Sequence, residues 1–326
     1  MLPAPPKLSL ISLGFRDFER HTKACLESLN DSAANSPLEF LVVDNGSGDE
    51  SADKTEAWCF AHPGFQFLRS DENRGFAGGM NYGAAQARGK WLLLVNNDTI
   101  FPEGAVKALL RAVSSCEEDV GMLCPITNAA GNGQRLWLRE KSTPDLLGIG
   151  KSLIENPTGH LMPTYRSDFF CVAIRREAWE KLGGLDTEFG LGYYEDFDFS
   201  LRLRAAGYRQ MITEDVFVIH VGSATFSESP EQKVLLRRNK KLLKSKHPDV
   251  RFEHCRDGNL AVLQAYMRLM ENDQWSEALQ IRLYLRLLAL RADEPRSLMK
   301  KLFWRLRTSK LQRLRKECRD HSVRPL

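Results

Sequence analysis

The sequence predicts an α/β protein in which a mostly parallel sheet is flanked by helices and followed by a C-terminal helical region. Short apolar runs alternate with helical patterns through the first hundred residues, as expected for βαβ units. Several of these runs stop abruptly at Asp, Asn or His, which would place polar side chains at one edge of such a sheet. After residue 226 the pattern changes to helices rich in Lys and Arg.

Composition restricts the class of protein. The chain has 326 residues, of which 43% are hydrophobic and 27% charged, as in soluble globular proteins. The net charge of +4 is too small by itself to imply nucleic acid binding. The seven cysteines are scattered without a C-x-x-C pair, which favours unpaired thiols over disulfides or a cysteine-based zinc site. No apolar run has the length of a signal-peptide core or a membrane-spanning helix, so we expect a cytoplasmic protein.

The first part of the chain contains four strand patterns separated by helical patterns. Residues 91–95 are a continuous apolar run, which is typical of a strand buried on both faces. We expect strands at residues 8–13, 38–43, 65–68 and 91–95. Helices are expected at 18–29, between the second and third strands, and in the glycine-rich stretch that begins at 73. Right-handed crossovers would then place all the strand carboxyl ends along one edge of the sheet.

The next part of the chain continues this alternation less regularly. We expect helices at 105–113 and 176–182, strands at 120–124, 169–174 and 216–220, and a helix that begins in the acidic segment 195–198. The stretch 125–166 is rich in Asn, Gly, Thr and Pro with little periodicity, so we expect a long loop there. Within it, residues 127–135 and the neighbourhood of Trp137 are candidates for a substrate-facing loop.

Polar residues at strand ends are the first candidates for a ligand site. Asn96, Asn97 and Asp98 follow one apolar run directly, Asp44 follows another, and His220 ends a third. Open α/β sheets bind ligands at the carboxyl ends of their strands. Asn and Asp are also common in turns, and a lone histidine is often structural, so both interpretations stay open at this point.

Two further segments carry candidate binding residues. Gly75, Gly78 and Gly79 lie at the start of a helix, where glycine allows close backbone approach and free N–H groups attract anions. This stretch matches neither a Walker loop nor the dinucleotide fingerprint, and tight helix–sheet packing explains Gly78 and Gly79 equally well. Glu195 and Asp196 follow an aromatic loop that could hold them in a pocket, although acidic residues also stabilise the first turn of a helix.

Several motifs, taken in order, resemble the family 2 glycosyltransferases of the GT-A fold, especially their bacterial rhamnosyltransferase-like members. They are VVDNGSGD at 42–49, NRGFAGGMNYG at 73–83, LLLVNNDTIFPEGAV at 92–106, the segment from FFCVAIRREAW to SLRLRAAGY at 169–208, and IHVGSATF at 219–226. The resemblance covers roughly residues 8–225. It implies a GT-A catalytic domain that transfers a sugar, with inversion, from a nucleotide-diphosphate donor to a saccharide or lipid-linked saccharide in bacterial surface polysaccharide synthesis.

The resemblance also implies roles for individual residues. Asp196 would be the general base that deprotonates the acceptor hydroxyl, with Glu195 beside it. Asp98 and His220 would hold a divalent cation, Mg²⁺ or Mn²⁺, next to the donor diphosphate. The donor, a dTDP- or UDP-linked sugar, would be bound by Asp44, Asn45, Asn73, Gly75, Gly78, Gly79 and Asn97. One departure is that the metal motif reads Asn96-Asn97-Asp98 rather than Asp-x-Asp, which leaves a single carboxylate in the triplet.

The implied chemistry accounts for these residue types. A leaving nucleoside diphosphate develops negative charge, which a cation offsets, and the attacking hydroxyl must lose its proton to a carboxylate. Paired carboxylates also serve direct hydrolysis, but a hydrolase would leave the nucleotide-type features at Asp44 and Gly78 without a purpose. Two further interpretations stay open: a catalytically inactive nucleotide-sugar or glycan-binding protein of the same fold, and a metal-independent transferase.

The C-terminal third is expected to consist of helices at 227–247, 258–272, 275–291 and 297–319. The last of them combines apolar residues, including Phe303 and Trp304, with many Lys and Arg. It could pack on the catalytic domain or on a second subunit of a homo-oligomer. It could also lie on anionic lipid, which leaves peripheral contact with the inner face of the cytoplasmic membrane open. No base-reading motif accompanies the charge, so we expect no nucleic acid partner.

These patterns divide the chain into a catalytic domain at 1–226 and a helical region at 227–326. Within the catalytic domain, we expect about 1–125 to form the nucleotide-sugar half and about 126–226 to form the acceptor half.

Overall fold

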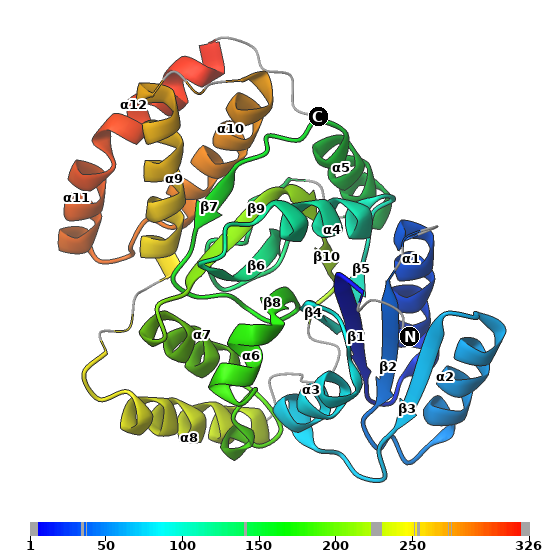
Figure 1. The fold of residues 1–326 in the computed structure, drawn as a ribbon. Helices are drawn as coiled ribbons and strands as arrows, with labels where there is room; N and C mark the ends of the chain where they lie inside the picture. The colour runs from blue at the N-terminus through cyan, green and yellow to red at the C-terminus, as the bar shows by residue number, and fades with distance from the viewer. Residues whose placement is uncertain are drawn as a thin grey trace.

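The structure is a computed structural model that describes residues 6–33, 36, 38–139, 142–222, 230–250, 252, 255–272, 274 and 276–320. Its centre is an eight-stranded sheet in the order β3-β2-β1-β4-β8-β6-β9-β7, with helices on both faces (Figure 1). The predicted fold class, a mostly parallel sheet flanked by helices with a helical C-terminal region, is confirmed.

The first four strands form a continuous parallel part of the sheet. They are β1 (Leu8–Gly14), β2 (Glu39–Asp44), β3 (Phe65–Arg69) and β4 (Trp91–Asn96). The segments between them contain the π-helical turn η1 (Phe18–Thr22) and the helices α1 (Lys23–Ala33), α2 (Glu50–Ala61) and α3 (Gly75–Gln86). Leu8 and Leu10 of β1 pack with α1 on one face of the sheet, and Ile11 and Leu13 pack with α3 on the other, so this strand is buried on both faces. The four strands predicted here are confirmed.

Two strands of the remaining sheet run against the others. β6 (Val120–Ile126) and β9 (Arg209–Phe217) are parallel to each other. β8 (Cys171–Arg175) is antiparallel to β4 and β6, and β7 (Leu161–Pro163) is antiparallel to β9. The single edge expected for the first four strands is confirmed, whereas the carboxyl ends of β7 and β8 lie at the opposite edge. Because β8 is reversed, the residues that precede it lie at the edge where β4 ends.

The prediction of a long loop at 125–166 is wrong. This stretch contains α5 (Thr143–Glu155) as well as β7. Ser142 caps α5 by accepting a hydrogen bond from the backbone of Asp145, and Leu146, Ile149 and Leu153 are buried. The capping serine and the apolar spacing were present in the sequence, but the surrounding Gly, Thr and Pro residues obscured them.

The strand predicted at 216–220 is divided in the structure. β9 begins at Arg209, and Val218 separates it from β10 (Ile219–His220). β10 pairs antiparallel with β5 (Thr99–Ile100), in a separate two-stranded sheet. The start of β9 was missed because it buries polar side chains, among them Gln210 and Glu214, which do not give an apolar run.

The remaining helices mostly follow the predictions. They are α4 (Ala105–Ser115), α6 (Arg176–Leu182), the short η2 (Thr187–Phe189), α7 (Glu195–Ala205), α8 (Pro230–Lys246), α9 (Cys255–Glu271), α10 (Glu277–Ala292), α11 (Leu298–Arg307) and α12 (Ser309–Asp320). The single helix expected at 297–319 is two helices, separated at the buried Thr308. Some predictions fall outside the described residues. They are the beginnings of the helices expected at 227 and 275, the domain boundary at 226 and the end of the IHVGSATF motif. Within those residues no helix has an apolar stretch long enough to cross a membrane.

The helices α9, α10, α11 and α12 lie together beside the β7 end of the sheet (Figure 1). Their apolar residues, such as Leu263 and Leu287, belong to the same buried cluster as Ile126 and Phe217 of the sheet. A buried ion pair crosses this contact: Arg286 of α10 lies 2.6 Å from Glu214 of β9. The C-terminal helices therefore share a core with the sheet, and the division at 226 stays a prediction.

Candidate active site

A pocket of about 720 Å³ opens at the edge of the sheet where β1, β2 and β4 end. Eight residues predicted from the sequence line it: Asn45, Asn73, Gly75, Asn97, Asp98, Glu195, Asp196 and His220. Its volume is in the range of small-molecule sites. One pocket thus joins four of the seven predicted donor-side residues to the predicted catalytic carboxylates.

Asp98 and His220 face each other in this pocket. The β5–β10 pairing places His220 opposite Thr99, the residue after Asp98. His220 Nε2 lies 3.4 Å from Asp98 Oδ2, and His220 Nδ1 lies 2.9 Å from the carbonyl oxygen of Ala129. Burial acts to raise the pKa of Asp98, but the hydrogen bond and charge of His220 outweigh it and hold this pKa below its ordinary value.

This pair has the chemical features of two ligands for a hard divalent cation. Asp98 Oδ1 is buried and has no hydrogen-bond partner among the described residues. A carbonyl next to His220 Nδ1 favours the tautomer in which Nδ1 carries the proton and Nε2 is free to coordinate. The described residues contain no group of three or more His, Cys, Asp or Glu side chains that could hold a metal ion. A cation here would need further oxygen ligands, such as amide or phosphate oxygens.

Amide groups connect the end of β2 to the start of α3. Asn45 Nδ2 donates to Asn73 Oδ1 and to the carbonyl oxygen of Gly75, both at 3.1 Å. Asn73 Oδ1 also accepts from the backbone N–H of Gly75 at 2.9 Å. Gly75 has φ +67°, and a Cβ there would lie 2.1 Å from the carbonyl oxygen of Gly190. Only glycine fits this contact, which brings the donor-side helix against the loop before α7.

Other predicted donor residues lie differently. Asp44 does not line the pocket, and Ser47 donates to both of its carboxylate oxygens, through its hydroxyl and its backbone N–H. Gly78 and Gly79 also lie off the pocket wall. A Cβ at Gly79 would meet Leu13 Cδ1 at 2.6 Å, which supports the helix–sheet packing interpretation for this glycine. Asn97 lines the pocket and donates from Nδ2 to Thr22 Oγ1 at 2.9 Å.

Glu195 and Asp196 begin α7 at the pocket wall. Glu195 is buried, with its Oε2 unpartnered among the described residues, and Asp196 is half-buried. Burial raises the pKa of Glu195 to about 8, helped by the negative charge of Asp196. Burial also raises the pKa of Asp196, to about 6, against the opposing positive charge of Arg166. Near neutral pH, these shifts favour an ionised Asp196 beside a protonated Glu195.

The two residues before this pair have a strained backbone. Tyr193 and Tyr194 have φ values of 72° and 76°, in the left-handed region that bulky side chains rarely occupy. Such strain persists only where neighbouring contacts enforce it, and it concentrates at functional sites.

Arg166 and Asp168 also line the pocket and were not predicted. Arg166 Nη2 lies 3.1 Å from Asp168 Oδ1, and the Arg166 guanidinium lies 5.0 Å from the centre of the Phe197 ring. Asp168 also accepts from the backbone of Gly131 and from Asn132 Nδ2, in the predicted substrate-facing loop. These residues precede β8, so only its reversed direction brings them to this edge, and no local signal in the sequence indicated that direction.

The family model described as "Glycosyl transferase family 2" matches residues 19–183, which is half of the chain. This chain belongs to glycosyl transferase family 2. The matched segment contains β2 and β4, two of the strands that end at the pocket, and the triplet with Asp98.

Relatives and solved structures agree with this assignment. An uncharacterized glycosyltransferase of Haemophilus influenzae is 27% identical over 180 residues, which cover 55% of this chain and 56% of that protein. The O-antigen biosynthesis protein RfbC of Myxococcus xanthus is 28% identical over 240 residues, which cover 68% of this chain and 18% of RfbC. The chain therefore spans at most about half the length of these curated relatives.

One solved structure shares the fold of this family 2 member over nearly its whole length. It is the mannosyltransferase PcManGT from Pyrobaculum calidifontis, solved in complex with GDP-Man and Mn²⁺. The TM-score is 0.55 at 19% identity, and the match covers 98% of this chain and 84% of that chain. The GT-A fold that the sequence motifs implied is confirmed.

In this glycosyltransferase family member, α8 clamps the strained loop before α7. Asn239 is fully buried, and its Nδ2 donates to the carbonyl oxygens of Phe189, Gly192 and Tyr193 at 2.7, 2.8 and 3.0 Å. Figure 1 shows α8 lying alongside α7. Neither residue pattern nor local motif singled out Asn239, because its role depends on a loop almost fifty residues earlier in the chain.

We expect Asn239→Ala to lower the free energy of unfolding by about 2 kcal/mol, because three loop carbonyls lose a buried donor. Urea denaturation would measure this loss. The matched control is Lys240→Ala, the exposed next residue of α8, which we expect to change the value by less than about 0.5 kcal/mol. Equal stabilities for the two variants would contradict the clamp.

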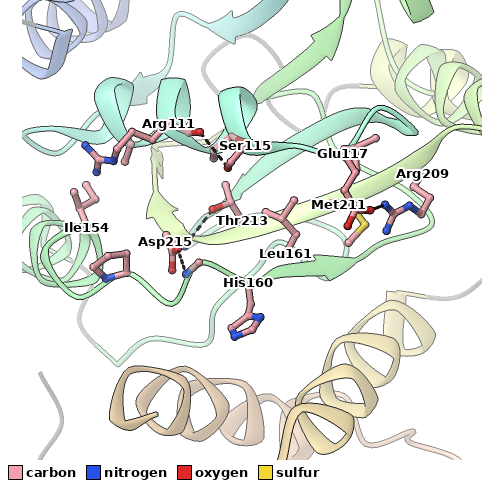
Figure 2. Close-up of a pocket in the computed structure, with 15 residues that line it drawn as sticks. Arg111, Ser115, Glu117, Ile154, His160, Leu161, Arg209, Met211, Thr213 and Asp215 are labelled. Carbon is pink, nitrogen blue, oxygen red and sulfur yellow. Dashed lines mark hydrogen bonds and ion pairs between the residues drawn. The ribbon is translucent and has the colours of Figure 1, made fainter. Parts of the chain in front are cut away.

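A second cavity of about 470 Å³ lies between α4, α5, β7 and β9 (Figure 2). Several of its polar groups are already bonded within the protein. Asp215 accepts from the backbone and hydroxyl of Thr158 and from the backbone of Gly159, and Arg209 pairs with Glu117. None of the predicted site residues lines it, so we do not assign it a role in catalysis.

Proposed function

We propose that this chain is an inverting, metal-assisted glycosyltransferase that moves a sugar from a nucleoside-diphosphate donor to an acceptor hydroxyl. One observation supports this most: a single pocket contains both the Asp98–His220 pair and the perturbed carboxyls of Glu195 and Asp196. Cation ligands and a general base within one pocket are what this reaction needs.

The donor would bind at the ends of β1, β2 and β4. Asn45 and Asn73 would contact it, and the first backbone N–H groups of α3 would attract its diphosphate. Asp98 Oδ1 and His220 Nε2 would hold Mg²⁺ or Mn²⁺, which offsets the negative charge that grows on the leaving diphosphate. Asp44, predicted to contact the nucleoside, would do so by holding the turn that its hydrogen bond with Ser47 closes. Asn97, Gly78 and Gly79 stay predicted donor-side residues.

The acceptor would lie on the side of α7. As its oxygen bonds to the anomeric carbon, the bond from that carbon to the diphosphate breaks, and the hydroxyl proton passes to Asp196. Attack from the face opposite the leaving group inverts the anomeric configuration. The protonated Glu195 beside it would donate a hydrogen bond rather than compete for the proton.

The substrates follow from the comparisons and the sequence together. The likeness to an O-antigen biosynthesis protein supports a saccharide or lipid-linked saccharide acceptor in bacterial surface polysaccharide synthesis. We propose a hexosyl donor linked to dTDP or UDP, with rhamnosyl transfer as the first reaction to assay. Because PcManGT was solved with GDP-Man, GDP belongs in the same panel. We also keep the proposed division into a donor half at about 1–125 and an acceptor half at about 126–226.

Thermal shifts with nucleoside diphosphates test the donor site. We expect UDP, dTDP or GDP to raise the melting temperature of the wild type, and Mn²⁺ to increase that shift, because ligands of the native state stabilise it. In Asp98→Asn the increase caused by Mn²⁺ should disappear. In the control Asp215→Asn, at the second cavity, the ligand-induced shift should be retained. No shift with any nucleotide would contradict the proposed function.

A nucleotide-sugar-binding protein without activity is the second candidate, favoured by the single carboxylate in Asn96-Asn97-Asp98. It predicts donor binding without turnover in the wild type. A metal-independent transferase would instead retain full activity in EDTA.

A further inference from the structure

One face of α11 exposes an unusual number of large apolar side chains. Eleven such side chains are exposed among the described residues, and five of them belong to this ten-residue helix. They are Leu298, Met299, Leu302, Phe303 and Leu306, with exposed fractions of 82%, 65%, 55%, 66% and 66%. Single exposed apolar residues are ordinary, but a contiguous group indicates an interaction surface.

The exposed residues form one stripe, which we call the α11 apolar face. At about 100° per residue, the five positions fall within an arc of about 140° around the helix axis. Trp304 lies on the opposite side of the helix, is 5% exposed and donates from Nε1 to the carbonyl oxygen of Leu290. The helix is therefore anchored to the protein through one side, and the α11 apolar face points away from the core.

Positive charge borders this face. α11 contains Lys300, Lys301, Arg305 and Arg307 and no acidic residue. By the same helical geometry, Arg305 and Arg307 lie next to the two margins of the arc, and both are exposed. They pair with Glu294 and Asp257, whereas Lys300 has no ion pair with any other described residue. The long Lys and Arg side chains of α11 can reach past an apolar layer to anionic groups.

We propose that the α11 apolar face docks this protein on the surface of an anionic lipid bilayer. The apolar stripe would enter the boundary between headgroups and acyl chains, while the flanking Lys and Arg contact anionic headgroups. A ten-residue helix is about 15 Å long, so it would lie in the plane of the interface. This inference concerns a surface outside the candidate active site and does not depend on the proposed activity.

Charge argues against the other occupants. In a two-fold dimer built on this face, the basic margins of one copy would face the same basic margins of the other. A nucleic acid would bind the cations but would leave five apolar side chains in water. An anionic bilayer satisfies both the apolar stripe and its charged border.

Flotation of the full chain with vesicles tests this proposal. The wild type should float with vesicles of phosphatidylcholine mixed with phosphatidylglycerol, and much less with pure phosphatidylcholine. Added salt should weaken binding by screening. The double variant Leu302→Glu/Phe303→Glu should bind the mixed vesicles at least about tenfold more weakly, because two apolar groups become charged. The matched control is Phe60→Glu, since Phe60 is 91% exposed on α2 and lies alone.

The outcomes distinguish a bilayer from a second copy of the chain. Wild-type protein that stays in solution, or a double variant that floats like the Phe60→Glu control, would overturn the proposal. A dimer that the double variant dissociates, without vesicle binding, would assign the face to a second copy instead. Leu306→Glu provides a milder variant if the double variant unfolds. Nucleotide-induced thermal shifts should be the same in all these variants, so failure of this proposal is distinguishable from failure of the proposed function.

Discussion

Asp196→Asn is expected to lower the rate of sugar transfer by about 10²–10⁴-fold while leaving the nucleotide-induced thermal shift unchanged. The amide of Asn cannot take the acceptor's proton, but it has nearly the same shape, so the pocket stays intact. Release of the nucleoside diphosphate in the presence of acceptor measures the rate. For the wild type, kcat/KM should fall as the pH drops below about 6, because the base must be ionised and burial raises its pKa to about 6.

Two further variants sharpen this result. Glu195→Gln should cost less activity than Asp196→Asn, since burial already keeps Glu195 protonated near neutral pH and Gln resembles that form. Asp53→Asn, exposed on α2, should leave transfer unchanged. Wild-type rates in Asp196→Asn would remove Asp196 from the role of base. Donor binding by a wild type that never turns over would favour a binding protein without activity.

Arg286→Met is expected to lower the free energy of unfolding by about 3–5 kcal/mol, because it leaves the carboxylate of Glu214 buried without a counter-charge. Glu214 and Arg286 are 0% and 2% exposed. Arg286 also donates to the carbonyl oxygens of Gly133 and Arg135, so the substitution removes the support of the predicted substrate-facing loop. Chemical denaturation of the full chain provides the measurement.

The double variant Glu214→Gln/Arg286→Met tests whether the unpaired charge causes this loss. It removes both charges, so it should recover part of the stability that Arg286→Met loses. Arg268→Met on the exposed side of α9 is the control for losing a basic residue, and we expect a change within about 0.5 kcal/mol. If the double variant were no more stable than Arg286→Met, an unpaired buried charge would not be the cause.

Local patterns were sufficient to predict the parallel part of the sheet. β1, β2 and β4 are buried on both faces, so most of their residues are apolar and the strands can be recognised in the sequence. The residues that follow β4, with His220 after β9, could be predicted to meet because parallel strands end at one edge. The structure places Asp98 and His220 in one pocket.

The features that sequence patterns missed all depend on contacts between distant segments. Arg166 and Asp168 reach the pocket only because β8 runs antiparallel to β4, and strand direction is not visible in a five-residue apolar run. Asn239 is one polar residue in a basic helix, and only the loop carbonyls that it contacts distinguish it from its neighbours. Only the apolar end of β9 was predicted as a strand. The preceding part contains Glu214, which is buried because it pairs with Arg286 of α10, and a charged residue does not indicate a buried strand in the sequence.

The small β5–β10 sheet has a consequence for the order in which the protein matures. It pairs Thr99 with His220, so the two proposed cation ligands come from widely separated parts of the chain. A nascent chain that ends before residue 219 can contain the first four strands and Asp98, but it cannot yet contain the imidazole ligand. Donor and cation would therefore give their full stabilisation only to chains that have completed the catalytic domain, and not to shorter intermediates.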